Sequence, residues 1–137
     1  MDVLQITFFA VLILGGVAII YILLAKPEHG NATLAAMLSA GFGAYTAVQI
    51  AQEGVVMFFT NHSANLTGIQ VWWDLVMCVG IALFFIAPRA RAANMNLVPW
   101  FLLVGGTASI GLLAMIARLF WLENQTANSS ATATAAA

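Results

Sequence analysis

Three charged side chains interrupt the apolar stretches of the chain, namely Glu53, Asp74 and Arg118. A charge at the centre of a membrane helix costs about 2.5–3.5 kcal/mol, so each is expected to have a partner or to line a wet cavity. Counted at about 1.5 Å per residue from the outer end of its stretch, each lies roughly 6–9 Å deep. One cation and two acids at one level predict an ion pair of Arg118 with Asp74 or Glu53, which leaves one carboxyl over.

Further polar side chains surround these charges. Positions 45, 49, 52 and 53 are spaced so that they share one helical face, and Gln70 comes one turn before Asp74. A polar face on a membrane helix must point at protein or water. The candidate polar cluster therefore consists of Tyr45, Gln49, Gln52, Glu53, Gln70, Asp74 and Arg118.

Two interpretations of this cluster stay open. Buried polar groups set the pairing and register of helices in small bundles, so Glu53, Asp74 and Arg118 can be purely structural. Alternatively, the cluster holds a ligand, a proton or a substrate. His62 either completes the cluster or is a solvated loop residue.

The sequence contains none of the common motifs for catalysis or cofactor binding. It has no phosphate-binding loop, no His-Glu-x-x-His and no dinucleotide-binding glycine pattern. Its single cysteine, Cys78, supplies neither an intrachain disulfide nor a metal-binding cluster. We expect no metal and no cofactor, we assign no catalytic residue, and the sequence leaves open whether the protein is an enzyme.

Composition places the chain in a membrane. It is 63% hydrophobic and 7% charged, whereas soluble domains carry roughly 25% charged residues. A formal net charge of −1 provides no basic field for nucleic acid, which excludes nucleic acid as a partner. The expected surroundings are the lipid bilayer.

Four apolar stretches have the length of a membrane span, for which about 20 residues are needed. They cover residues 3–25, 32–59, 69–87 and 97–122. None shows the alternation that a membrane β-strand needs. The predicted fold is an all-α membrane protein, a four-transmembrane-helix antiparallel bundle over residues 1–122, followed by a disordered polar tail over residues 123–137.

Short polar loops separate the stretches, at residues 26–31, 60–68 and 88–96. Pro27 and Pro88 are expected to end the helices before them, because proline removes a backbone donor. Asn31 and Asn96 are expected to cap the helices after them.

The second stretch has 28 residues, which as a helix is about 42 Å long and more than a bilayer requires. It must tilt, protrude or break. Gly54 is the natural break point, and the sequence does not decide between these possibilities.

Basic residues predict the orientation. Lys26, Arg89 and Arg91 lie in loops 26–31 and 88–96, and short loops rich in Lys and Arg stay cytoplasmic. We therefore expect a multi-pass protein of the cell (inner) membrane with both termini outside. The aromatic residues expected near the inner interface are Tyr21 and Trp100, and those expected near the outer one are Trp72, Trp73 and Trp121.

Several short motifs carry a family resemblance. They are Gln-Glu-Gly (52–54), Phe-Phe-Thr-Asn (58–61), Trp-Asp-Leu (73–75), the Arg-Ala-Arg turn (89–91) and Gly-Leu-Leu…Ile-Ala-Arg (111–118). Together they resemble a small bacterial integral-membrane family whose domain has no known function. The order of features is more distantly similar to Aba4-type four-span membrane proteins of carotenoid metabolism. The resemblance implies that Asp74 and Arg118 occupy family-typical positions.

The expected function is that of a small integral membrane protein, a structural or helper subunit of a membrane complex, with other membrane proteins or a second copy as partners. The first alternative is an enzyme or binder of an apolar, isoprenoid-like ligand held in an outer-leaflet polar pocket. The second alternative is a small transporter. A co-purifying protein favours the first of these three functions, and a co-purifying lipid or pigment favours the second.

Overall fold

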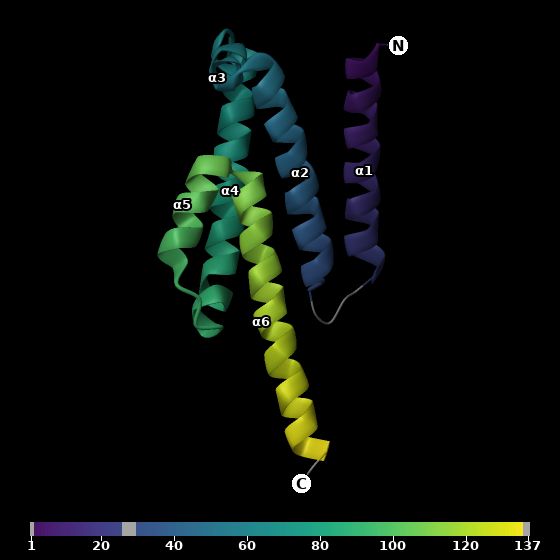
Figure 1. The fold of residues 1–137 in the computed structure, drawn as a ribbon, viewed down its shortest axis with the longest axis vertical. Helices are drawn as coiled ribbons and strands as arrows, with labels where there is room; N and C mark the ends of the chain where they lie inside the picture. Colours follow the sequence, from purple (N-terminus) through teal and green to yellow (C-terminus); the bar gives the residue numbers. More distant parts are fainter. Residues whose placement is uncertain (1, 26–29, 136–137) are drawn as a thin grey trace. The chain divides into compact units, whose positions relative to one another are not determined.

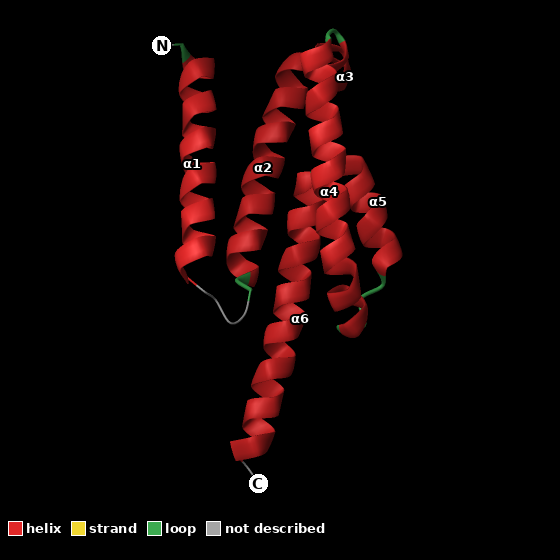
Figure 2. Ribbon diagram, turned by 180° about the vertical axis from the view of Figure 1, so that it is seen from behind, coloured by secondary structure: helices red, strands yellow, loops and turns green. Residues whose placement is uncertain are grey.

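The computed structural model describes residues 2–25 and 30–135, which are almost entirely helical (Figures 1 and 2). These residues form six helices and no strand: α1 (Val3–Ala25), α2 (Ala32–Glu53), α3 (Val55–Ser63), α4 (Leu66–Ala92), α5 (Leu97–Thr107) and α6 (Ser109–Ala135). The prediction of an all-α protein is confirmed, but the helices differ in number from the four predicted. The chain forms two compact units, Met1–Gly30 and Asn31–Ala137.

Helix α1 makes up the described part of the first unit. Asp2 and Gln5 begin it: the Asp2 carboxylate accepts from the Gln5 amide at 2.8 Å, and the Gln5 side chain accepts from the Asp2 amide at 3.2 Å. Such reciprocal bonds satisfy donors that the first helical turn leaves free. Most of the first predicted loop follows at residues 26–29, including Lys26 and Pro27, and these lie outside the described residues.

Three helices, α1, α2 and α4, are long and apolar enough to cross a membrane. Their lengths of 22 to 27 residues match the roughly 30 Å of hydrocarbon in a bilayer. This finding supports the assignment as a membrane protein. The predicted fourth span is not a single helix in this structure.

Helix α6 is the centre of the second unit. It runs beside α2 and also contacts α4 and α5 (Figures 1 and 2). Met115 and Leu119 of α6 are fully buried and pack against Ala90 near the end of α4. Near the beginning of α6, the Ser39 hydroxyl of α2 donates to the Ile110 carbonyl at 2.9 Å.

The long second stretch breaks at Gly54, which separates α2 from α3. Gly54 has φ 80° and ψ 155°, a conformation that glycine adopts without the steric cost of a side chain. Helix α3 then leads into α4 through a tight corner. A Cβ on Gly68 would lie 2.7 Å from the His62 carbonyl oxygen, so the corner requires glycine there.

Pro88 does not end α4, contrary to the prediction. The helix continues through Pro88 to Ala92. A proline removes one backbone hydrogen bond, but the turn that follows is held by tertiary contacts, because Ala90 is buried against α6 and Arg89 pairs with Glu123. The polar loop is correspondingly shorter than residues 88–96.

The predicted span over residues 97–122 is replaced by two antiparallel helices, α5 and α6. The chain reverses at Ala108, which has φ 47° and ψ −114° and donates its amide to the Val104 carbonyl at 2.7 Å. The Thr107 hydroxyl donates to the Leu103 carbonyl and accepts from the Gly111 amide. These local bonds satisfy the backbone at the reversal, so the apolar stretch folds back on itself.

The predicted disordered tail also differs, because α6 continues to Ala135. Alanine favours helix, and hydroxyl groups in this segment donate to the carbonyl four residues earlier instead of competing with the helix. The donors are Thr126, Ser129, Ser130, Thr132 and Thr134. Figure 1 shows α6 continuing past the ends of α4 and α5.

Candidate functional site

Asp74 lies on the exposed face of α4, which points away from the rest of the second unit. The buried and half-buried side chains of α4, such as Trp72, Leu75 and Val79, recur at helical spacing on its inner side. Asp74 is exposed on the opposite side, with exposed Gln70 one turn before it and exposed Cys78 one turn after it. These three residues are called the α4 polar row below.

The carboxylate of Asp74 has only a weak partner within the described chain. The Cys78 thiol donates to Asp74 Oδ1 at 3.9 Å. Among residues 2–25 and 30–135, no cation forms an ion pair with Asp74. The apolar side chains Met77 and Ile81 continue the same exposed side of α4.

Arg118 does not approach Asp74 in the structure. Its neighbour Leu119 packs against Ala90, which is 16 residues after Asp74 on α4, or about 24 Å along the helix axis. The Arg118 guanidinium carbon instead lies 4.3 Å from the centre of the Trp121 ring. The predicted ion pair of Arg118 with Asp74 is therefore not formed.

The ion pair of the described chain joins Arg89 and Glu123. Arg89 Nη2 lies 2.7 Å from Glu123 Oε2, and Arg89 Nε lies 3.0 Å from Oε1. The Arg89 guanidinium carbon is also 5.6 Å from the centre of the Phe120 ring. Sequence reasoning missed this pair because it assigned Arg89 to a loop and Glu123 to a tail on the opposite side.

The α2 members of the candidate polar cluster do not join Asp74 or Arg118. Gln49 is half-buried, whereas Gln52 and Glu53 are exposed near the end of α2. Tyr45 is exposed and stacks on Phe42, with 6.5 Å between ring centres. No hydrogen bond or ion pair connects the α2 group with α4 or α6 cluster members in the described residues.

His62 lies in α3 rather than in a loop. Its Nδ1 is 2.9 Å from the Phe58 carbonyl oxygen. The Phe58, Phe59 and Trp72 rings pack together beside it, with centre distances of 5.2 to 5.7 Å. His62 thus belongs to an aromatic corner, and the described residues hold no group of three His, Cys, Asp or Glu side chains placed to bind a metal.

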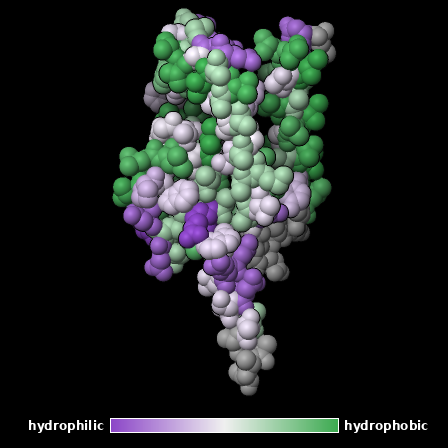
Figure 3. Space-filling model, viewed as in Figure 1, coloured by the Kyte–Doolittle hydropathy of each residue, from purple (hydrophilic) through white to green (hydrophobic). Residues whose placement is uncertain are grey.

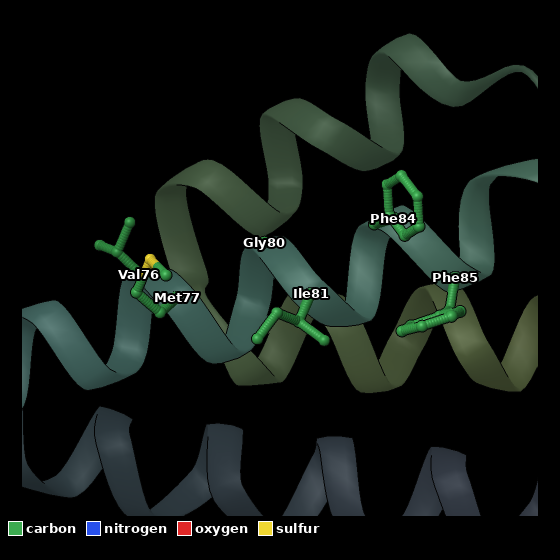
Figure 4. Close-up of a pocket in the computed structure, with 6 residues that line it drawn as sticks. All are labelled: Val76, Met77, Gly80, Ile81, Phe84 and Phe85. Atoms are coloured by element: carbon green, nitrogen blue, oxygen red, sulfur yellow. The ribbon is translucent and has the colours of Figure 1, made fainter.

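Two shallow apolar grooves run along α4. The larger has a volume of about 430 Å³ and the smaller about 260 Å³, and both include Val76. Figure 4 shows the larger groove, in which Gly80 leaves a gap between apolar side chains. Its lining consists of Val76, Met77, Gly80, Ile81, Phe84 and Phe85. The groove offers contact to an apolar group and no polar chemistry.

Comparison with known proteins gives no match: no protein-family model, no curated protein and no solved structure matches the chain. The resemblances drawn from its short motifs therefore stay predictions.

Proposed function

We propose that this chain is a small structural or helper subunit of a membrane protein complex. It contacts its partner through the exposed face of α4 that carries the α4 polar row. The observation that carries this proposal is the exposed Asp74 carboxylate, which has no cationic partner among the described residues although it lies within a membrane-length helix.

Lipid explains the apolar surface of α4 but not its carboxylate. The exposed side chains next to the α4 polar row, including Met77 and Ile81, are compatible with acyl chains. An acid in the same surface is unfavourable in hydrocarbon, and membrane proteins satisfy such groups with partners or water. A protein partner supplies the missing group and covers the apolar side chains at the same time.

The partner is a membrane helix that presents a Lys, Arg or His side chain at the depth of Asp74. Charge complementarity supports this choice over a second copy of the chain. A symmetric pair of α4 helices would bring two Asp74 carboxylates together, and like charges in one site oppose each other.

The single thiol of the chain tests the proposal directly. Cys78 is exposed and lies one turn from Asp74, so a photoactivatable crosslinker attached to it reports on whatever covers the α4 polar row. In native membranes we expect one crosslinked product with a membrane protein whose spanning helix carries a basic residue. Neutralising that basic residue should abolish the product.

Variants of the acids supply the control. Asp74→Asn should abolish the product, and Asp74→Glu should retain it. Glu53→Gln, the matched removal of an exposed acid on α2, should leave it unchanged. A product made of two copies of this chain, or one that survives Asp74→Asn, overturns the proposal.

The proposed setting is the cell (inner) membrane, with residues 26–31 and 88–96 in the cytoplasm and the N-terminus outside. The basic residues of these two segments support this orientation. The sequence alone predicts an outside C-terminus as well. The Arg89–Glu123 pair instead supports a cytoplasmic C-terminus, because it places Glu123 beside Arg89. In this arrangement α5 and α6 enter and leave the bilayer on one side, and the chain crosses the membrane three times.

The grooves on α4 support a second candidate function, binding of an apolar, isoprenoid-like molecule. The larger groove is lined by five apolar side chains and one glycine, and it exposes almost no polar atoms. Organic extraction of the purified protein would test this function. A stoichiometric isoprenoid that is lost in Gly80→Leu, which fills the gap, supports it, and bulk phospholipid alone contradicts it.

A further inference from the structure

Three arginines lie at one end of the second unit, where α4 ends beside α6. Arg89 and Arg91 are in the last turn of α4. Arg118 of α6 lies at the same level, because its neighbour Leu119 packs against Ala90. These three residues are called the arginine end. Figure 3 shows hydrophilic colour at the lower part of the second unit, below its hydrophobic helices, and also at its upper end.

The positive charge of one of these three arginines is neutralised by an acidic residue. Glu123 pairs with Arg89 through two contacts. Arg91 and Arg118 are exposed and form no ion pair with any residue in the described ranges. The arginine end therefore keeps two unneutralised positive charges, while the exposed acids Glu53 and Asp74 lie toward the opposite end.

The position of Arg118 against Trp121 favours an anion in the membrane interface. The guanidinium carbon lies 4.3 Å from the indole ring centre, so the ring face holds the cation by a cation–π contact. Tryptophan prefers the level of lipid headgroups. A guanidinium over a ring face still has N–H groups that can donate to a further partner, and these match a phosphate in a two-point geometry.

We infer that the arginine end binds the phosphate of an anionic phospholipid in the leaflet that it faces, through Arg118 and Arg91. This inference is independent of the α4 partner, since it concerns the opposite end of the second unit. It also holds whichever side of the membrane the arginine end occupies.

Native mass spectrometry of the full chain tests the inference. The protein is purified in a non-ionic detergent and mixed with equal amounts of dioleoyl phosphatidylglycerol and dioleoyl phosphatidylcholine. A basic residue near an anionic lipid contributes roughly fivefold in binding, so the first bound lipid should be phosphatidylglycerol in at least roughly fivefold excess. Arg118→Gln should reduce this excess about fivefold.

Acid variants give the matched controls. Glu123→Gln frees Arg89 and should raise the excess, whereas Glu53→Gln changes the net charge equally at the other end and should leave it unchanged. Circular dichroism confirms that each variant is folded. Equal binding of the two lipids by the parent chain, or an excess unaffected by Arg118→Gln in folded protein, overturns the inference.

A further arm separates a lipid headgroup from free phosphate. Sodium phosphate and sodium chloride are compared at equal ionic strength. The lipid site should respond to both salts alike, through screening. Selective displacement of the lipid by phosphate would assign the site to a free anion and contradict the inference.

Discussion

Arg89 and Glu123 are 34 positions apart in the sequence and form a two-point ion pair between α4 and α6, with contacts of 2.7 and 3.0 Å. The pair joins the end of α4 to α6, and α5 belongs to the chain segment between the two paired residues. It also sets α6 at the level of the last turn of α4. Together with the Leu119–Ala90 packing, it fixes the position of α6 along α4.

The first prediction concerns the energy of this pair. The two side chains are 51% and 28% exposed, so solvent screening limits their coupling to about 0.5–1 kcal/mol. We expect Arg89→Gln and Glu123→Gln to destabilise the protein less in combination than the sum of their separate effects. Chemical unfolding in detergent measures all four free energies, and strictly additive losses would show that the pair contributes nothing.

The second prediction concerns the close approach of α5 and α6. A Cβ on Gly111 would lie 2.7 Å from Thr107 Oγ1 and 2.8 Å from the Leu103 carbonyl oxygen. Gly111→Ala should therefore cost about 1–3 kcal/mol of stability through overpacking.

Gly106 is the matched control for this substitution. A Cβ there has nothing within 4 Å, so Gly106→Ala should be neutral or stabilise by up to about 1 kcal/mol through helix propensity. Thermal unfolding of both variants in detergent decides the matter. Equal effects of the two substitutions would contradict the antiparallel packing of α5 and α6.

The third prediction uses two methionines of opposite burial. Met115 is fully buried in the core, and Met77 is 55% exposed on α4. Met115→Ala should cost about 2–5 kcal/mol, because it removes apolar contacts and leaves a cavity. Met77→Ala should change stability by less than about 0.5 kcal/mol, and a larger loss at Met77 than at Met115 would place the core elsewhere.

The fourth prediction concerns membrane topology. In a Cys78→Ser background, Asn94→Cys and Ser130→Cys should react with an impermeant maleimide only after the cells are permeabilised. Asp2→Cys should react in intact cells. Labelling of Ser130→Cys from outside, with Asn94→Cys protected, would restore a single span over residues 97–122.

The local features of the fold were accessible from the sequence. Asn31 accepts from the Leu34 amide at 2.9 Å and Asn96 from the Val98 amide at 3.2 Å, so both act as the predicted caps, since the capping preference of asparagine is a local property. Gly54 was identified as the natural break point for a similar reason. The sequence could not choose a break over a tilt, because that depends on packing around α3.

The reversal at Ala108 left no clear signal. Residues 97–122 are mostly apolar, with Thr107, Ser109 and Arg118 as the exceptions, and hydropathy does not distinguish one spanning helix from two helices packed together. Alanine rarely adopts positive φ, so nothing at position 108 marked the turn.

This reversal also explains the error about Arg118. The depth of Arg118 in the membrane was counted on the assumption that residues 97–122 form one membrane-crossing helix. On that assumption Arg118 lies at the same depth as Asp74. The acid at position 74 is visible in the sequence as an interruption of an apolar stretch, but its exposure without a cationic partner differs from the predicted ion pair.

The hairpin of α5 and α6 has a consequence for biosynthesis. The chain after Glu123 is rich in Asn, Gln, Ser and Thr, and moving such groups through hydrocarbon is costly. In the proposed arrangement with three crossings, the hairpin enters and leaves the bilayer on one side and needs no such transfer. In that arrangement α5 and α6 fold together against the helices already in the bilayer, with α6 packed on α2 and α4, and the polar residues that follow Glu123 are not translocated.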